Sequence, residues 1–387
     1  MVDKKVPELR FEGFDGDWEQ RKVGEVFSER SERSGEGELI SVTINSGVVK
    51  ASELDRKDNS SDDKSNYKKV EVGDIAYNSM RMWQGASGYS PYNGILSPAY
   101  TVIIPKKDID SKFFAYDFKR YDMIQTFKRN SQGLTSDTWN LKFPTLKSVK
   151  VMVPSIEEQK QISTFFESLD TTITLHQQKL DQLKRLKQGF LQILFGNKEQ
   201  APKVRFAGFD EEWEQRKLGE VVQITMGQSP NSEYYTENPL DHILVQGNAD
   251  MKNNRVVPRV WTTQVTKQAE KGDLILSVRA PVGDIGITDY DVVLGRGVAA
   301  IKGNDFIFQQ LVKMKKEGFW NRFSTGSTFE SINSNDIKEA LITIPNGDEQ
   351  KSIGSFFANL DTTIALHQTK LEKLKQLKKG FLQSMFI

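Results

Sequence analysis

The sequence predicts an α/β (α+β) protein in which an antiparallel two-helix coiled coil separates two globular mixed α/β domains, built as a pseudo-two-fold internal repeat. Two observations support this fold class. Two sequence blocks each occur twice, in the same order, along the 387 residues. The longer block has the apolar periodicity of a helix, whereas the segments between the blocks carry strand and turn patterns.

The shorter block covers residues 7–26 and returns at residues 202–221, with about 14 of 20 positions identical. Both copies contain the pentapeptide WEQRK, which begins at Trp18 and at Trp213. Two interpretations of the tryptophans remain open. They form a docking face for a partner, or they belong to an edge-strand packing motif at the entrance to each domain.

The longer block covers residues 154–195 and returns at residues 345–386, with about 26 of 42 positions identical. Each copy opens with a proline and a capping box, Ser155 with Glu158 and Asn346 with Glu349, which predicts that a helix begins there. We expect each helix to break, at residues 170–172 and 361–363, because an aspartate at these places could cap a second, longer helix.

Beyond each expected break, apolar residues recur every three or four positions and form one stripe along the helix. The stripe includes Leu180 and Leu183 in the first copy, and Leu371 and Leu374 in the second. Its obvious partner is the equivalent stripe, packed antiparallel. A helix of about 25 residues would be ~37 Å long, close to the ~34 Å between DNA half-sites one turn apart. The coil would then act as a ruler.

Two other features of the helices recur. His176 and His367 occupy matching positions, and neither has a second histidine near it in the sequence. We therefore interpret both as seam residues that set the helix register, not as metal ligands. The basic ends of the helices, which include Lys187 and Lys378, could face phosphates, but favourable placement near a helix C-terminus is the plainer explanation.

The segments between the blocks, residues 27–153 and 222–344, match far less. Weak echoes remain: Gly73-Asp74 beside Gly272-Asp273, and Ser79-Met80-Arg81 beside Ser277-Val278-Arg279. They suggest one fold that bears two different surfaces. We expect strands at residues 75–77, 100–104, 274–278, 292–294 and 298–301, and helices at residues 112–129 and 306–323. With a linker at residues 196–201, the predicted domains are residues 1–153, 154–196, 197–344 and 345–387.

The composition excludes several classes of protein. The chain has no cysteine, so it forms neither disulfides nor thiolate metal sites, and its 3 histidines make a histidine-rich metal centre improbable. The 53 basic and 52 acidic residues give a formal charge of +1, which leaves DNA binding open because a local basic face can coexist with acidic ones. No apolar run approaches the ~20 residues of a membrane span, so we expect a cytoplasmic protein and no membrane partner.

No catalytic motif is recognisable. An amino-methyltransferase would be expected to show Asn/Asp-Pro-Pro-aromatic, and Asn238-Pro239-Leu240 fails at the second proline. Residues 295–300 mimic a dinucleotide-binding loop, but no helix clearly follows them. We therefore predict no catalytic and no metal-binding residue in this chain.

The repeated layout, the EEQK-type start of each helix, the LDTTI segment and the LKxLKxGFLQ ending resemble the conserved regions of Type I restriction-modification specificity (S) subunits, the HsdS family. The resemblance spans essentially the whole chain. It implies a non-catalytic subunit in which two target recognition domains each read one half of a bipartite asymmetric site in double-stranded DNA. It also implies that the helices dock two methyltransferase subunits, that motor-nuclease (restriction) subunits join, and that the complex directs adenine methylation and restriction. S-adenosylmethionine, ATP and Mg are expected on those partner subunits, and no cofactor on this chain.

Carried over by position, Arg81 and Arg279 are the first candidates for DNA contact, since arginine suits guanine edges and phosphates. The residues around them and before the paired Gly-x-Thr motifs complete the candidate DNA-binding set: Trp83, Gln84, Arg129, Asn130, Ser131, Thr135, Arg296, Arg322, Thr325, Ser327 and Thr328. Core packing for Trp83 and solvated polar loops for the others are the alternatives. The candidate partner-binding residues are Trp18, Trp213, Leu180, Leu183, Leu371 and Leu374.

Two other functions remain open at this stage. The chain could be a nuclease or methyltransferase whose site escapes motif analysis, in which case purified protein would modify or cut DNA without partners. It could instead be a scaffold that does not bind DNA, in which case it would show no sequence preference and little of the steep salt dependence of a phosphate-contacting protein.

Overall fold

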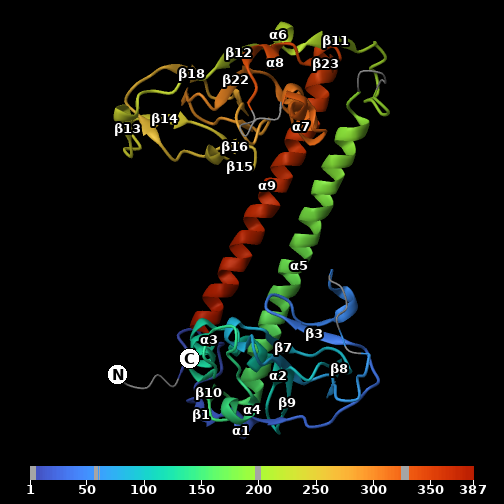
Figure 1. The fold of residues 1–387 in the computed structure, drawn as a ribbon, viewed down its shortest axis with the longest axis vertical. Helices are drawn as coiled ribbons and strands as arrows, with labels where there is room; N and C mark the ends of the chain where they lie inside the picture. The colour runs from blue at the N-terminus through green and yellow to red at the C-terminus, as the bar shows by residue number, and fades with distance from the viewer. Residues whose placement is uncertain (1–5, 56–59, 61, 197–201, 324–330) are drawn as a thin grey trace. The chain divides into compact units, whose positions relative to one another are not determined.

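The computed structural model describes residues 6–55, 60, 62–196, 202–323 and 331–387. It contains two compact units, one of Met1–Leu175 with Leu371–Ile387 (unit 1) and one of His176–Lys370 (unit 2). Two long helices, α5 (Ile156–Ile193) and α9 (Gly347–Ser384), each contribute one part to unit 1 and one part to unit 2 (Figure 1). The boundary between the units therefore falls within both helices, whereas the predicted domain ranges treated each helix as a separate region.

Unit 1 is built around short antiparallel strands. Its sheets, in strand order, are β1 (Glu19–Lys22) with β10 (Lys150–Val153); β2 (Phe27–Glu29), β9 (Tyr100–Pro105), β6 (Ile75–Asn78) and β7 (Ser87–Tyr89); β3 (Ile40–Thr43) with β4 (Gly47–Lys50); and β5 (Lys68–Val70) with β8 (Gly94–Leu96). Its short helices are α1 (Val23–Val26), η1 (Ala51–Glu53), η2 (Met82–Gln84), α2 (Ser111–Asp117), α3 (Tyr121–Asn130) and α4 (Phe143–Leu146).

Unit 2 has the same first strand pair and two larger sheets. Its sheets are, in strand order, β11 (Glu214–Lys217) with β23 (Leu341–Ile344); β12 (Gln223–Met226), β22 (Val298–Lys302), β19 (Leu274–Ser277), β20 (Ile285–Ile287), β16 (Arg255–Val256) and β15 (Met251–Lys252); and β13 (Tyr235–Thr236), β17 (Trp261–Thr262), β14 (His242–Val245), β21 (Val292–Leu294) and β18 (Lys267–Ala269). In the two larger sheets, β14 pairs parallel with β21 and β16 parallel with β20. Its short helices are α6 (Leu218–Val221), η3 (Ser232–Tyr234), η4 (Asn248–Asp250), α7 (Asp305–Lys316), η5 (Phe319–Phe323) and α8 (Ser334–Lys338).

The short repeated block forms the same strand pair in each unit. Glu19 lies opposite Val153 in β1 and β10, and Glu214 lies opposite Ile344 in β11 and β23. In each case the partner strand ends just before the long repeated block begins. The two repeated blocks are therefore brought together by backbone pairing, with the variable insert looped out between them.

The predicted strands are confirmed as β6, β9, β19, β21 and β22. The two predicted insert helices are each interrupted, which corrects their length. Residues 118–120 separate α2 from α3, where Arg120 has extended backbone angles (φ −66°, ψ 149°). In unit 2, Gly318 adopts a left-handed φ of +69° after α7, and a 3-10 helix follows. A left-handed residue ends a helix because it breaks the backbone hydrogen-bond ladder.

The predicted breaks in the long helices are wrong, because α5 and α9 run without interruption through residues 170–172 and 361–363. The hydroxyls of Thr171 and Thr172 donate to the carbonyls of Glu167 and Ser168 at 2.9 Å, four residues earlier. Asp170 does not cap a helix, since its carboxylate accepts hydrogen bonds from side chains of other elements. The local polar residues are thus compatible with a continuous helix.

Aromatic contacts show that the helices pair antiparallel within each unit, as predicted. In unit 1, Phe165 near the start of α5 contacts Phe381 near the end of α9, with ring centroids 5.1 Å apart. In unit 2, Phe190 near the end of α5 contacts Phe356 near the start of α9, at 4.9 Å. The start of one helix therefore lies against the end of the other in both units.

Each unit's core takes in the last turn of the helix that belongs to the other repeat. Met385 and Phe386 join the core of unit 1, and Leu191, Leu194 and Phe195 join that of unit 2. None of the helices in the described part of the chain is long and apolar enough to cross a membrane.

Candidate nucleic-acid interface

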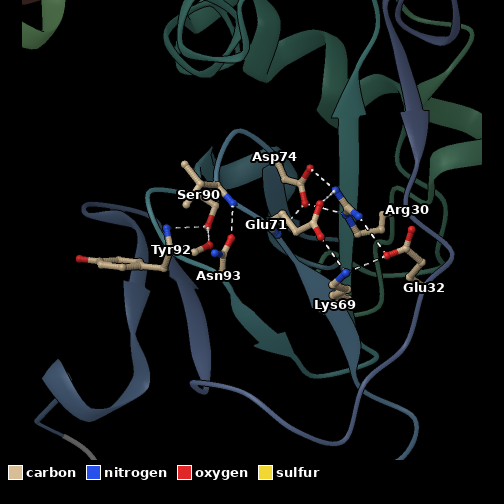
Figure 2. Close-up of polar contacts among 9 residues, drawn as sticks. Arg30, Glu32, Lys69, Glu71, Asp74, Ser90, Tyr92 and Asn93 are labelled. Carbon is tan, nitrogen blue, oxygen red and sulfur yellow. Dashed lines mark hydrogen bonds and ion pairs between the residues drawn. The ribbon is translucent and has the colours of Figure 1, made fainter.

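The two inserts share a turn that the Gly-Asp echo marks. The carboxylate of Asp74 accepts the backbone N–H of Glu71 at 2.8 Å, and that of Asp273 accepts the N–H of Glu270 at 2.9 Å. In unit 1 the Ser90 hydroxyl then donates to the Tyr92 carbonyl (Figure 2). Thr288 and Tyr290 make the same bond in unit 2 at 2.7 Å. The inserts therefore have a common frame even where their sequences differ.

In unit 1, a buried arginine, Arg30, binds the aspartate of this shared turn. Its guanidinium is buried and donates to both carboxylate oxygens of Asp74, at 2.8 and 2.9 Å, and to Glu71 (Figure 2). Hydrogen bonding to Asp74 raises the pKa of Arg30. Lys69 and Glu32 extend the network at the surface. This arginine is committed to the fold and is not a DNA-binding candidate.

The structure brings the candidate residues of the first insert together. Helix α3 packs against η2, which carries Trp83 and Gln84 and directly follows Arg81, and Arg129 is exposed near the end of α3. Trp139 joins them, with its ring centroid 5.2 Å from that of Trp83. The Nζ atom of Lys128 lies 5.6 Å from the Trp139 ring. Basic and aromatic side chains on one surface suit contact with phosphates and bases.

The individual side chains differ in availability. Arg81 is half-buried and lines a cavity of about 660 Å³ together with Asn78 and Tyr100. Trp83 is also half-buried, and its indole N–H donates to the Met80 carbonyl at 3.0 Å. The side chains of Asn130 and Ser131 donate to carbonyls of the last turns of α3, at 2.9 and 2.8 Å. The side-chain donors of these two residues are therefore used to cap the C-terminal end of α3.

A loop that follows α3 carries Thr135 on the surface. Gln132 and Asn140 exchange two backbone hydrogen bonds, of 3.0 and 2.8 Å, which close the loop. Its most exposed apolar residue is Leu134, at 102% exposure. Sequence reasoning did not single out Leu134, Lys128 or Trp139, because each has an ordinary structural explanation until η2, α3 and this loop are seen side by side.

In the second insert, three arginines lie on adjoining segments. The exposed Arg279 follows β19, and the exposed Arg296 precedes β22, which pairs with β19. Arg322 belongs to η5, and its guanidinium stacks 3.7 Å from the Phe319 ring centroid. Trp320 of η5 packs so closely on Gly283 that an added Cβ there would lie 2.3 Å from the indole. This contact holds η5 against the turn that follows Arg279.

Two glycines flank Arg296 for a steric reason. A Cβ on Gly297 would lie 2.1 Å from the carbonyl oxygen of Gln246, and one on Gly295 would lie 3.1 Å from that of Val245. The resemblance to a dinucleotide-binding loop is thus explained by close backbone packing, which leaves the Arg296 side chain to project outward. The remaining candidates of this insert, Thr325, Ser327 and Thr328, lie outside the described residues.

Lys119 connects two turns of the first insert. Its ammonium donates to the carbonyls of Ile44 and Gly85, at 2.9 and 2.5 Å, and so ties the β3–β4 turn to the turn that follows Arg81. Burial, and then the charge of Lys378, lower the pKa of Lys119 to about 8 from its usual 10.5. The partly buried ammonium therefore makes the packing of this surface sensitive to pH.

Replacing Lys119 by methionine tests that link. The folded protein holds the Lys119 proton less tightly than the unfolded chain does, so between about pH 8 and 10.5 the unfolded chain binds more protons and stability rises with pH. We expect the free energy of unfolding to rise less over this range in Lys119→Met, as measured by urea denaturation. The exposed Lys142 is the control, and Lys142→Met should keep the wild-type rise. Identical profiles in Lys119→Met and wild type would contradict the lowered pKa of Lys119.

Equivalent ion pairs connect the two repeated blocks. Arg10 donates two hydrogen bonds of 2.7 Å to Glu158 at the start of α5. Arg205 makes the same fork to Glu349 at the start of α9, at 2.9 and 2.6 Å, and Trp213 adds a third bond at 3.1 Å. These contacts anchor the short block on the first turn of each long helix.

The structure favours the packing interpretation of the repeated tryptophans. Trp18 is only 2% exposed and packs edge-on against Phe113 and Phe386. Its indole N–H has no hydrogen-bond partner among the described residues. Trp213 is half-buried and packs on Phe306. This corrects the prediction of a docking role for Trp18, because a partner cannot reach a side chain inside the core.

The leucine stripe is likewise used within the protein. Leu180, Leu183 and Leu371 are buried, and Leu374 is half-buried. Lys187, one turn beyond Leu183 on the same face, reaches Asp361 of α9. The stripe thus faces the paired helix, which corrects the prediction that these leucines bind a separate partner.

A carboxylate in each LDTTI segment joins three elements. Asp361 accepts hydrogen bonds from Lys187 of α5 at 2.5 and 2.7 Å and from Gln309 of α7 at 2.8 Å. In unit 1, Asp170 accepts the corresponding bonds from Lys378 of α9 and from Tyr116 of α2. The two lysines therefore bind aspartates rather than presenting their charges to phosphates.

Neither His176 nor His367 has another histidine near it in the sequence, but the two side chains meet in three dimensions. The Nδ1 atoms of His176 and His367 lie 3.4 Å apart across the helix pair of unit 2. Partial burial, and then the charges of Lys370 and His367, lower the pKa of His176. The predicted seam position is compatible with this contact, but the two rings also form a pair that the sequence did not reveal.

Family comparison now identifies the repeat. A model of the Type I restriction modification DNA specificity domain matches residues 15–185 and again residues 210–376. The chain belongs to the Type I restriction-modification specificity subunit family. The two matches coincide with the two copies of the frame, so the inserts of this specificity subunit are its DNA sequence recognition domains.

Relatives and solved structures agree with this assignment. The specificity subunit is 28% identical, over 286 residues, to a putative type I restriction enzyme specificity subunit (MjaX) of Methanocaldococcus jannaschii, covering 71% of this chain and 67% of the relative. Its fold is similar to that of a Type I restriction-modification S subunit from M. genitalium, with a TM-score of 0.68, 15% identity and 99% of each chain covered. A chain from a structural study of type I complex assembly and conformational transition matches with a TM-score of 0.56 and 20% identity, over 95% of this chain and 97% of that chain.

Proposed function

We propose that each recognition domain of this specificity subunit reads one half of a bipartite, asymmetric site in double-stranded DNA. The observation that supports this is a shared frame with different surfaces. The first insert brings Trp83 and Lys128 together around Trp139, with Arg81 just before η2, whereas the second presents Arg279 and Arg296 on adjoining strand ends. Two surfaces of different chemistry on one frame suit two different base sequences.

The subunit acts in this proposal without catalytic chemistry of its own. Two methyltransferase subunits dock on the exposed faces of α5 and α9, restriction subunits join them, and the complex methylates adenine or cleaves DNA in the cytoplasm. S-adenosylmethionine, ATP and Mg belong to those partners. What supports two equivalent docking places is that the long block, with its Glu158 and Glu349 anchors, is present twice with about 26 of 42 positions identical.

Single arginine substitutions test the assignment of half-sites. We expect Arg81→Ala to weaken recognition of one half-site, and Arg279→Ala that of the other, each roughly 5- to 150-fold, since a good arginine–base contact contributes about 1–3 kcal/mol of discrimination. The readout is affinity for duplexes in which one half-site at a time is scrambled, measured with the methyltransferase complex at fixed salt.

The control is Arg30→Lys, which alters a buried arginine of the same domain; any loss that it causes should fall on the first domain's half-site and come with a lower free energy of unfolding, which Arg81→Ala should leave unchanged. Loss of the same half-site in Arg81→Ala and Arg279→Ala would contradict the two-domain assignment. Mapping of methylated adenines in cells that carry this subunit and its methyltransferase would give the sequence itself. Modified or cut DNA in the absence of partners would instead establish an enzyme.

A further inference from the structure

The contact between His176 and His367 has the geometry of half a metal site. His176 lies on α5 and His367 on α9, and both rings are half-exposed. Their Nδ1 atoms face each other at 3.4 Å, with ring centroids 5.5 Å apart and planes inclined by 49°. A nitrogen pair at this separation is longer than a good N–H hydrogen bond, which spans roughly 2.7–3.2 Å.

The same separation fits a bridging cation. Two bonds of about 2.0–2.1 Å from Zn²⁺ to imidazole nitrogens, at the tetrahedral angle, place the nitrogens ~3.4 Å apart. We propose that His176 and His367 bind one transition-metal ion of the zinc class through their Nδ1 atoms and so clasp α5 to α9. This inference is independent of the proposed function.

The chemistry of the pair selects the kind of ion. Imidazole nitrogens suit Zn²⁺, Ni²⁺ and Cu²⁺, whereas Mg²⁺ and Ca²⁺ require oxygen ligands. No group of three or more metal-ligating side chains occurs among the residues that the structure describes, so water completes the coordination. The partial exposure of both rings admits that water. Lys370 is a charged neighbour of His176, and its positive charge weakens the binding of any cation there.

The rest of the chain makes the site easy to isolate in an experiment. There are no cysteines and only 3 histidines, and the third, His242, is exposed on β14. His242 therefore reports on adventitious binding by a single surface histidine. Because an ion that binds only the folded protein stabilises it, occupancy should also raise the melting temperature.

The decisive experiment titrates the full chain, labelled at its histidines, with ZnCl₂ after EDTA treatment and follows the imidazole signals by NMR. The signals of His176 and His367 should change together and saturate at one equivalent of zinc, while that of His242 does not. Zinc affinity measured by calorimetry should fall at least tenfold in His176→Gln and in His367→Gln, and stay unchanged in His242→Gln. Raising the MgCl₂ concentration should not displace the zinc.

Two results would overturn the proposal. One is a wild-type titration in which His176 and His367 do not respond, or respond only as weakly as His242. The other is unchanged zinc affinity in both glutamine variants. Melting of each variant in EDTA shows whether it is folded, and the wild-type titration needs no variant, so a misfolded substitution does not obscure the outcome.

Discussion

Replacing Arg205 by alanine should lower the free energy of unfolding by about 3 kcal/mol or more, since removing one partner of a buried ion pair leaves an uncompensated charge. Glu349 is 0% exposed, and Arg205 supplies two of the side-chain hydrogen bonds to its carboxylate. Only the Trp213 indole would remain as a side-chain donor among the contacts described above. Urea denaturation followed by circular dichroism measures the loss.

The matched control is Arg216→Ala in the same repeated block. Arg216 is exposed and pairs with the exposed carboxylates of Glu214 and Glu220, so its loss should cost less than about 0.5 kcal/mol. Arg10→Ala, which breaks the equivalent pair with Glu158, should have an effect similar to that of Arg205→Ala. If Arg205→Ala behaves like Arg216→Ala, the anchoring role of Glu349 is refuted.

Phe357→Ala should be about as damaging, at roughly 3–5 kcal/mol, because it opens a cavity in a closely packed core. Phe357 is 0% exposed and packs against Phe195 and Phe356, with ring centroids 5.8 and 5.3 Å away. Since Phe195 comes from the end of the first repeat, the cavity would loosen the join between repeats within unit 2. Hydrogen exchange should show protection falling first in the ends of α5 and α9 that meet there.

The control for this cavity lies on the same helix. Leu366 is exposed on α9, and Leu366→Ala should change stability by less than about 0.5 kcal/mol. Phe166→Ala, the counterpart in unit 1, should match Phe357→Ala in magnitude but lower protection in unit 1. Equal loss of protection in both units from Phe357→Ala alone would contradict the local cavity.

The fold of the repeated blocks could be predicted from the sequence because each block occurs twice. Duplication exposed the two repeated blocks, the helix starts and the antiparallel pairing, each of which has a local or periodic signal. The predicted helix breaks failed for a physical reason. Asp170 looks like a cap in the sequence, but its carboxylate is bound to Tyr116 and Lys378, and a tertiary contact of this kind overrides a local propensity.

The candidate site was less accessible to sequence reasoning. Arg81 and Arg279 could be chosen by repeat position, but Trp139 and Lys128 became candidates only because η2, α3 and the following loop lie together. Likewise, His176 and His367 are 191 residues apart, and no spacing rule joins them. The candidate site is formed by contacts between segments that are far apart in the chain. Local sequence patterns do not predict such contacts.

Each repeat needs residues from the end of the other repeat's long helix to complete its hydrophobic core. Phe195 completes the core of the second repeat, and Phe386 completes that of the first. Neither half is therefore self-sufficient, and a polypeptide cut near residue 196 would leave two mutually dependent fragments. The first half alone would lack Phe386, which completes its hydrophobic core. The equivalent residue, Phe195, could fill that place only from a second copy of the same half.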